Sequence, residues 1–207
     1  MSRHIGYLFI APAFVILFFT SIYPVAFSFY FSFFDWNWGN QENFIGLDNY
    51  LFLLTDPEFW TVIYNTFVFA SVSCFLEVTI GIILAIFVDR IVFCSTIIRT
   101  ILILPLMVSG IIVSMISKIM FNNLFGVIPY GLKQIDIRSS FFGSTEAAMP
   151  TLIGVDVWWQ TSFVFIIILA ALQGIPNDTL EAAKIDGASE WDITRFIRLP
   201  LIKPIIF

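Results

Sequence analysis

The stretch Thr179-Leu-Glu-Ala-Ala-Lys-Ile-Asp-Gly-Ala-Ser-Glu-Trp-Asp-Ile-Thr-Arg-Phe-Ile-Arg-Leu-Pro200 is the longest polar segment in a chain otherwise built of apolar runs. Its residues predict a short helix, a turn and a second short helix over 178–200. We expect the second helix to stop before Pro200, because proline lacks a backbone N–H and disfavours a helical residue in front of it. A helix-turn-helix thus lies between two hydrophobic segments.

Local signals place the ends of these two helices. Asp178 and Glu181 are three residues apart, as in a capping box, and they predict the start of the first helix. Gly187 can adopt the left-handed conformation that ends a helix. Ser189 with Asp192 predicts the start of the second helix by the same capping-box spacing. Two such helices around a glycine also occur in soluble proteins, so the pattern alone does not assign a function.

The composition indicates an all-α integral membrane protein. Of 207 residues, 59% are hydrophobic and 12% are charged, whereas soluble domains have about a quarter charged residues. A single core cannot hold this much apolar surface, so we expect a lipid-facing exterior. The net charge of −5 argues against a nucleic acid partner, because binding the phosphates needs a basic surface.

Four apolar runs are long enough to cross a bilayer, which takes roughly 20 residues. The predicted spans are 7–34, 61–88, 100–121 and 151–172, and a fifth begins near 205. We expect residues 122–150, on the outer side, to be partly folded on the membrane surface. The chain is therefore one multi-pass transmembrane domain, 1–207.

The lysine and arginine residues of the loops predict its orientation. With the N-terminus inside, seven basic residues face the cytoplasm: Arg3, Arg90, Arg99, Lys184, Arg195, Arg198 and Lys203. Three lie outside or at the outer edge: Lys118, Lys133 and Arg138. This bias places the helix-turn-helix on the cytoplasmic side.

The spacing Glu181-Ala182-Ala183, three residues, Gly187, nine residues, Ile197, one residue, Leu199 resembles the cytoplasmic signature of the permease subunits of binding-protein-dependent ABC importers. Further stretches resemble the sugar subfamily, the maltose and glycerol-phosphate type. They are Phe44–Tyr50, Asp56–Trp60, Asn65-Thr66, Arg99-Thr100, Leu104-Pro105 with Ser109, and Ala170–Pro176. Together these motifs extend over nearly the whole chain.

The resemblance implies a type I ABC importer permease fold and a function in sugar or polyol import. Members usually have six core spans, so we expect the chain to be truncated near the start of the fifth. The implied partners are a second permease subunit in a heterodimer, a cytoplasmic ATPase dimer and an extracytoplasmic solute-binding protein. The implied location is the plasma (inner) membrane of a bacterium or archaeon.

This chain itself is not expected to be an enzyme or to bind a cofactor. It has no G-x-x-x-x-G-K-[ST] phosphate loop and no H-E-x-x-H metal motif, and its one histidine is His4. ATP and Mg would be bound by the partner ATPase.

The resemblance also implies which residues dock the ATPase. Glu181 would be a charged handle, Ala182 and Ala183 would allow close approach, and Gly187 with Asp186 would form the turn. The same loop includes Ile197, Leu199 and Pro200.

Two groups within the spans are candidates for a role in solute transfer. Glu77 lies in the middle of a span, where a carboxylate is costly, so it faces either the solute path or a partner helix. The neighbouring Thr79 and Gly81 favour helix packing. Trp158, Trp159, Gln160 and Thr161 could contact a sugar or form an interfacial aromatic belt.

Two alternative functions follow from these observations. One is an ABC permease for a non-sugar solute such as a polyamine. The other is an ion-coupled secondary transporter, which would have several ionisable residues within its spans.

Overall fold

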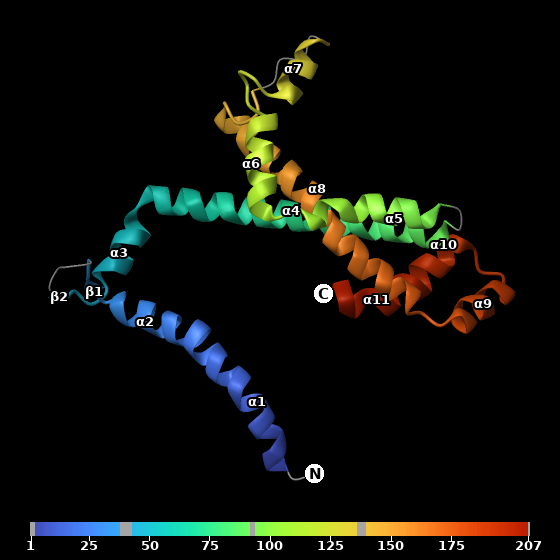
Figure 1. Ribbon diagram of the computed structural model, residues 1–207, viewed down its shortest axis with the longest axis horizontal. Helices are drawn as coiled ribbons and strands as arrows, with labels where there is room; N and C mark the ends of the chain where they lie inside the picture. The colour runs from blue at the N-terminus through green and yellow to red at the C-terminus, as the bar shows by residue number, and fades with distance from the viewer. Residues whose placement is uncertain (1–2, 38–42, 92–93, 136–139, 207) are drawn as a thin grey trace. The chain divides into compact units, whose positions relative to one another are not determined.

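Helices dominate the structure, a computed structural model that describes residues 3–37, 43–91, 94–135 and 140–206 (Figure 1). The chain divides into two units, Met1–Asn65 and Thr66–Phe207. Arg138, one of the basic residues assigned to the outer side, lies outside the described residues.

The first unit begins with a long apolar helix that contains a π-helical segment just before a proline. It comprises α1 (Arg3–Leu17), the π-helical segment η1 (Phe18–Ile22) and α2 (Tyr23–Phe31). The Tyr23 N–H bonds to the Phe18 carbonyl five residues earlier. A proline ring collides with the carbonyl four residues before it in a regular α-helix, and the π-turn makes room for Pro24. The helix therefore accommodates Pro24 through a π-bulge.

Residues of the motif Phe44–Tyr50 form hydrogen bonds with the residues that follow α2. Strand β1 (Phe34–Asp35) pairs antiparallel with β2 (Asn43–Phe44), and α3 (Asp48–Thr55) follows. The Asn49 side-chain amide donates to the carbonyls of Ser32 and Phe34 at 2.9 and 3.1 Å. The Tyr50 and Ser32 hydroxyls are 2.6 Å apart. Two residues of the motif thus have a structural role in closing this turn.

Long helices that pack together form the second unit. Helix α4 (Pro57–Arg90) starts in the first unit and continues into the second, where α5 (Ser95–Ile103), the 3-10 segment η2 (Leu104–Met107) and α6 (Gly110–Met120) follow. Then come α7 (Val127–Lys133) and α8 (Thr145–Gln173). The C-terminal elements are α9 (Asn177–Ile185), α10 (Glu190–Asp192), the π-helical η3 (Ile193–Arg198) and α11 (Leu199–Ile206).

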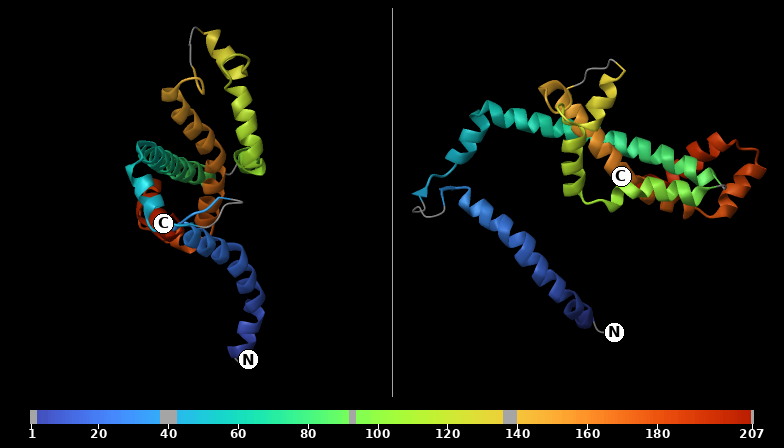
Figure 2. Two further views of the ribbon diagram at one scale, coloured as in Figure 1. Left: turned by 90° about the vertical axis from the view of Figure 1, so that its left-hand side faces the viewer. Right: turned by 45° about the horizontal axis from the view of Figure 1, so that its top comes forward.

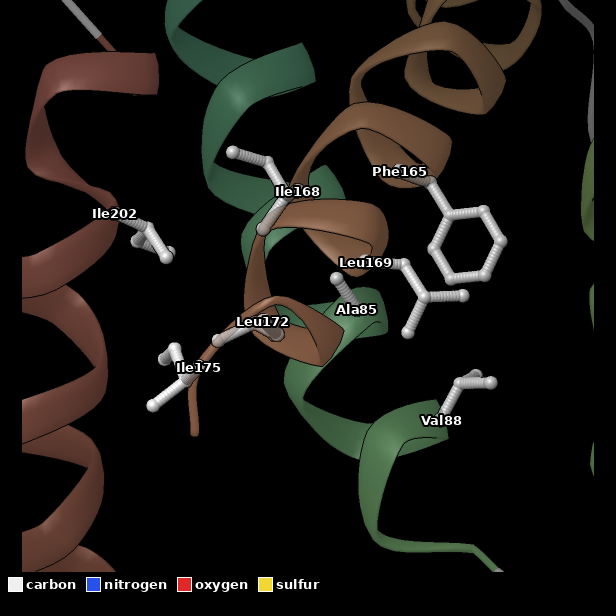
Figure 3. Packing of buried hydrophobic residues seen from close by; sticks show 8 residues of the cluster. All are labelled: Ala85, Val88, Phe165, Ile168, Leu169, Leu172, Ile175 and Ile202. Atoms are coloured by element: carbon white, nitrogen blue, oxygen red, sulfur yellow. The ribbon is translucent and has the colours of Figure 1, made fainter. Parts of the chain in front are cut away.

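A buried apolar cluster joins α4, α8 and α11 (Figure 3). It contains Ala85, Val88, Phe165, Ile168, Leu169, Leu172, Ile175 and Ile202. Phe165 and Ala85 are fully buried. Gly81, one α4 turn before Ala85, allows the two long helices to approach closely, since a Cβ there would lie 2.6 Å from Val164 Cγ1 on α8. The predicted role of Gly81 in helix packing is confirmed.

Three helices have the length and hydropathy of membrane spans: Phe9–Phe31, Pro57–Arg90 and Thr145–Gln173. Most of their large apolar side chains are exposed, as a lipid-facing surface requires. The fourth expected span, 100–121, is not straight. Ser95–Met107 and Gly110–Met120 meet at 92°, so among the described residues the count is three spans, or four if the bent pair crosses as one (Figures 1 and 2).

The bend has a local cause and a brace from another helix. Pro105 lies in η2, and Val108 and Ser109 have extended backbone, so the helical hydrogen bonds stop and restart at Gly110. The indole Nε1 of Trp159 on α8 donates to the Val108 carbonyl at 3.1 Å. Its ring fills the space above Gly110, where a Cβ would lie 2.8 Å from the ring. Hydropathy alone could not predict this break, because both halves are apolar.

The second helix of the polar segment does not end before Pro200, contrary to our expectation. Glu190 to Ile206 is helical throughout, passing through Pro200 and Pro204. Here too a π-helical segment, η3, precedes the proline and provides the room that its ring needs. The helix-turn-helix is therefore continuous with α11, which packs against α8.

Candidate functional site

The polar helix-turn-helix, which we define as residues 177–200, has a turn fixed by backbone hydrogen bonds. Helix α9 ends at Ile185, and Gly187 has a φ of +84°. The Ala188 N–H bonds to the Ala183 carbonyl at 3.0 Å, and the Gly187 N–H bonds to the Lys184 carbonyl at 3.1 Å. This pair of bonds is the Schellman motif, with glycine in its left-handed position. The predicted left-handed conformation of Gly187 is confirmed.

The second helix starts with the predicted capping box. Ser189 Oγ accepts from the Asp192 N–H at 3.2 Å, and the Asp192 carboxylate accepts from the Ser189 N–H at 3.1 Å. The hydrogen bonds from Ser189 hold the pKa of the Asp192 carboxyl below its usual range. The capping box predicted at the first helix is wrong, because α9 starts at Asn177 after Pro176 and no side chain caps it.

The predicted docking residues lie mainly on the surface of this element. Glu181, Ala182, Asp186 and Gly187 are exposed, and Ala183 is half-buried. In the second helix and the residues after it, Ile197 and Leu199 are half-buried and Pro200 is exposed. The first helix and the turn thus offer an accessible surface, while the second helix contributes side chains to the interior.

Sequence reasoning missed three exposed apolar side chains on the same element. Ile185, Trp191 and Phe196 are 86%, 67% and 65% exposed. The signal was available, because each is a large apolar residue in a polar stretch that predicts a solvent-facing helix. Each of these side chains is accessible to a partner that covers this element.

The buried side of the element faces the rest of the unit. Ile193 and Thr194 are 1% and 3% exposed, and Arg198 is 8% exposed. Arg90, at the end of α4, donates from Nη2 to Thr194 Oγ1 at 2.5 Å. The helix-turn-helix is therefore fixed on one side and free on the other.

The mid-span carboxylate Glu77 lies beside a second carboxyl group. Its side chain contacts that of Asp156 on α8 and is partly buried. Ser73, one turn earlier on α4, is 3% exposed. A contact with α8 is what the helix-packing interpretation of Glu77 requires. The pairing with Asp156 joins residues far apart in sequence and had no signal that could be found in advance.

The four candidate solute-contact residues on α8 have different surroundings. Trp158 is 58% exposed and lines a cavity of about 620 Å³ between α6, α7 and α8. Trp159 braces the bend, and Gln160 is half-buried. Thr161 is 7% exposed, and its hydroxyl has no hydrogen-bond partner among the described residues. The structure therefore separates Trp158, which is accessible, from Trp159, which is occupied by an internal bond.

Replacing Trp159 with Phe tests this difference. The change keeps an aromatic side chain but removes the donor to Val108 and the outer ring atoms above Gly110. The lost hydrogen bond alone costs on the order of 1 kcal/mol. We expect a lower melting temperature of the detergent-solubilised protein. Trp158→Phe is the matched control and should change it less. Equal effects of the two substitutions would contradict the assignment of Trp159 as the brace.

Comparison with known proteins agrees with this architecture. Residues 77–207 match the family described as binding-protein-dependent transport system inner membrane component. The chain is 36% identical over 198 residues to the probable starch degradation products transport system permease protein AmyD of Thermoanaerobacterium thermosulfurigenes, covering 96% of this chain and 68% of the relative. It is 33% identical to the trehalose/maltose transport system permease protein MalF of Thermococcus litoralis, covering 98% and 69%.

A solved structure gives the same result for the fold. The crystal structure of a bacterial alginate ABC transporter in complex with an alginate pentasaccharide-bound periplasmic protein contains a similar chain, with a TM-score of 0.83 and 25% identity. The match covers 98% of this chain and 68% of that one. The chain thus spans about two thirds of the length of these relatives. From the matched residues, the identities and the shared fold, this chain belongs to the family of binding-protein-dependent transport system inner membrane components, in its sugar ABC permease branch.

Proposed function

We propose that this chain is a translocating subunit of an ATP-driven importer that carries a sugar or related polyol into the cytoplasm. The observation that carries the proposal is the helix-turn-helix 177–200, which is exposed on one side, anchored on the other and continuous with α11. A rigid element of this kind can transfer the movement of a docked protein to the helices behind it. The named sugar substrates of the relatives support the solute class.

In this proposal a separate ATPase dimer supplies the energy and docks on the helix-turn-helix. Glu181 is exposed and available to a basic group of the ATPase. Ala182 is also exposed, and its small side chain allows a partner to approach the α9 backbone closely. The exposed apolar side chains Ile185, Trp191 and Phe196 add area for burial. The bias of basic residues toward the same side supports a cytoplasmic location for this element and for the N-terminus.

The remaining partners are proposed by the same reasoning. A second permease subunit would complete the path, and an extracytoplasmic solute-binding protein would deliver the solute. On this chain, we assign Trp158 to the path because it is accessible and lines the cavity. A sugar can pack its apolar face on an indole ring. Gln160 and Thr161 are not among the residues that line this cavity, and an amide or hydroxyl contact from them to the sugar stays a prediction.

Uptake by the full-length protein, reconstituted with its partner subunits in proteoliposomes, tests the proposal. We expect labelled malto-oligosaccharide to accumulate with ATP, and not with a non-hydrolysable analogue, on the side that holds the ATPase. Accumulation of a polyamine in place of sugars would support the alternative solute. Uptake without ATP that a protonophore abolishes would identify an ion-coupled transporter and contradict the proposal.

A further inference from the structure

Two charged side chains tie the C-terminal end of α4 to the second helix of the helix-turn-helix. Arg198 Nη2 lies 3.5 Å from Asp89 Oδ2, and the two side chains are only 10% and 16% exposed. Asp89 is in the last turn of α4, where the helix dipole disfavours a carboxylate, so it needs a nearby cation. Removing one partner of such a buried pair leaves the other charge without compensation. The pair therefore holds the two helices together.

A second carboxylate, Glu190, brings three cations from three elements together. Its Oε1 is 3.3 Å from Lys184 Nζ on α9. Its Oε2 is 3.9 Å from Arg198 Nη1 on η3 and 4.0 Å from Arg90 Nε on α4. Arg90 also donates to the Glu190 backbone carbonyl at 3.1 Å. Glu190 thus links both helices of the helix-turn-helix to the end of α4.

The two carboxylates, Asp89 and Glu190, differ in the solvent exposure of their ion pairs. Asp89 and Arg198 are nearly buried, whereas the side chains of Glu190, Lys184 and Arg90 are 47%, 58% and 39% exposed. Exposed ion pairs are individually weak, about 1 kcal/mol or less, so Glu190 can exchange among its cations at little cost. The network therefore combines one nearly buried pair, Asp89 with Arg198, and one exposed carboxylate shared among three cations.

The end of α4 is also where that helix packs on its neighbours. Val88, one residue before Asp89, is fully buried in the cluster with Leu172 of α8 and Ile202 of α11. The backbone joins the helix-turn-helix to α8 and α11 but not to α4. The side chains of Asp89 and Arg90 supply that third connection.

We propose that the network of Asp89, Arg198, Glu190, Arg90 and Lys184 makes α4 move with the helix-turn-helix when the ATPase closes. The inference rests on the proposed function and adds to it the residues that carry the motion to a span with no backbone link to the docking element. These are positioning residues, since they act through α4 and not on the solute. Loss of the network should uncouple ATP hydrolysis from transport without detaching the ATPase.

The test uses the full-length chain assembled with its partners, and it measures the ATPase retained on purification and the ATP hydrolysed per solute imported. For Asp89→Asn and Glu190→Gln we expect retained ATPase within about twofold of wild type. We expect at least roughly a tenfold rise in ATP consumed per solute for Asp89→Asn and a smaller rise for Glu190→Gln. The conservative change Asp89→Glu, which keeps a carboxylate beside Arg198, should lose much less than Asp89→Asn. Glu146→Gln, an exposed carboxylate at the far end of α8, is the matched control.

Each result decides the inference. An unchanged ATP-to-solute ratio in both single variants would overturn it, as would an Asp89→Glu variant no better than Asp89→Asn. Loss of ATPase attachment in the milder Glu190→Gln variant would show a brace for docking and not a joint. If the wild-type complex itself holds no ATPase and imports nothing, the proposed function fails first, and the role of the network fails with it.

Discussion

Replacing Gly187 with Val should abolish uptake and detach the ATPase while leaving membrane insertion intact. Gly187 has a φ of +84°, which costs an L-residue roughly 1–2 kcal/mol and a β-branched one more. A Cβ at this position would meet nothing within 4 Å, so the effect is conformational and not a collision. To relieve the strain the turn must change, and α10 then moves relative to α9.

Two other substitutions make this expectation specific. Asn tolerates the left-handed region, so Gly187→Asn should retain much more uptake than Gly187→Val. Gly174→Ala is the matched control, because Gly174 ends α8 with a φ of −78° and an added Cβ would make only ordinary contacts. The measurements are solute uptake and co-purification of the ATPase. Normal uptake by Gly187→Val would remove the helix-turn-helix from the mechanism.

Gly81→Ala should give the second large effect, this time on stability. The new Cβ would lie 2.6 Å from Val164 Cγ1 and 2.9 Å from Val164 Cβ. Valine has essentially one side-chain rotamer in a helix, so α4 and α8 must separate. Overpacking of this kind typically costs about 1–3 kcal/mol. We expect a lower melting temperature of the purified protein and a smaller yield of folded protein.

The chain offers a close control for this prediction. Gly154 lies inside α8, and a Cβ there would meet nothing within 4 Å. Gly154→Ala should therefore leave stability unchanged or raise it slightly, because alanine favours the helix. Adding Val164→Ala to Gly81→Ala removes the nearest atom and should recover part of the loss. A Gly81→Ala protein as stable as the Gly154→Ala protein would show that the two helices do not pack as closely as the structure has them.

Features set by nearby residues were predictable from the sequence. The Schellman turn at Gly187 and the capping box of Ser189 with Asp192 need only a few consecutive residues, and both were placed correctly. The role of Gly81 followed from its small size beside a mid-span carboxylate. Three of the four predicted spans followed from length and hydropathy.

The continuation of helices through prolines and the bend between α5 and α6 were not predictable in the same way. Proline ends most helices, yet π-helical segments precede both Pro24 and Pro200 and the helices continue. After Pro200 the continuing helix, α11, packs against α8. The 92° bend is likewise braced by Trp159, about 50 residues further along the chain.

The charged groups around the helix-turn-helix show the same limit. Sequence reasoning assigned Arg90, Lys184 and Arg198 to one side of the membrane by counting, with no partners named. Their shared carboxylate, Glu190, is separated from Arg90 by about a hundred residues. The spacing of residues in a single sequence does not reveal a pairing over that separation. The choice of Trp158 over Trp159 for the solute path also needed the structure.

Cross-linking of the helix-turn-helix to the ATPase tests the central claim most directly. In the full-length protein with Cys74 and Cys94 replaced by Ser, a single cysteine is placed at Glu181, at Ile185 or, as a control, at Tyr130 on α7. Helix α8, with 29 residues and a length of about 44 Å, separates α7 from α9 along the chain. We predict cross-links to the ATPase from positions 181 and 185, changing in yield when ATP binds, and none from position 130. Cross-links from position 130 alone, or none at either α9 position in a complex that still imports solute, would contradict the account.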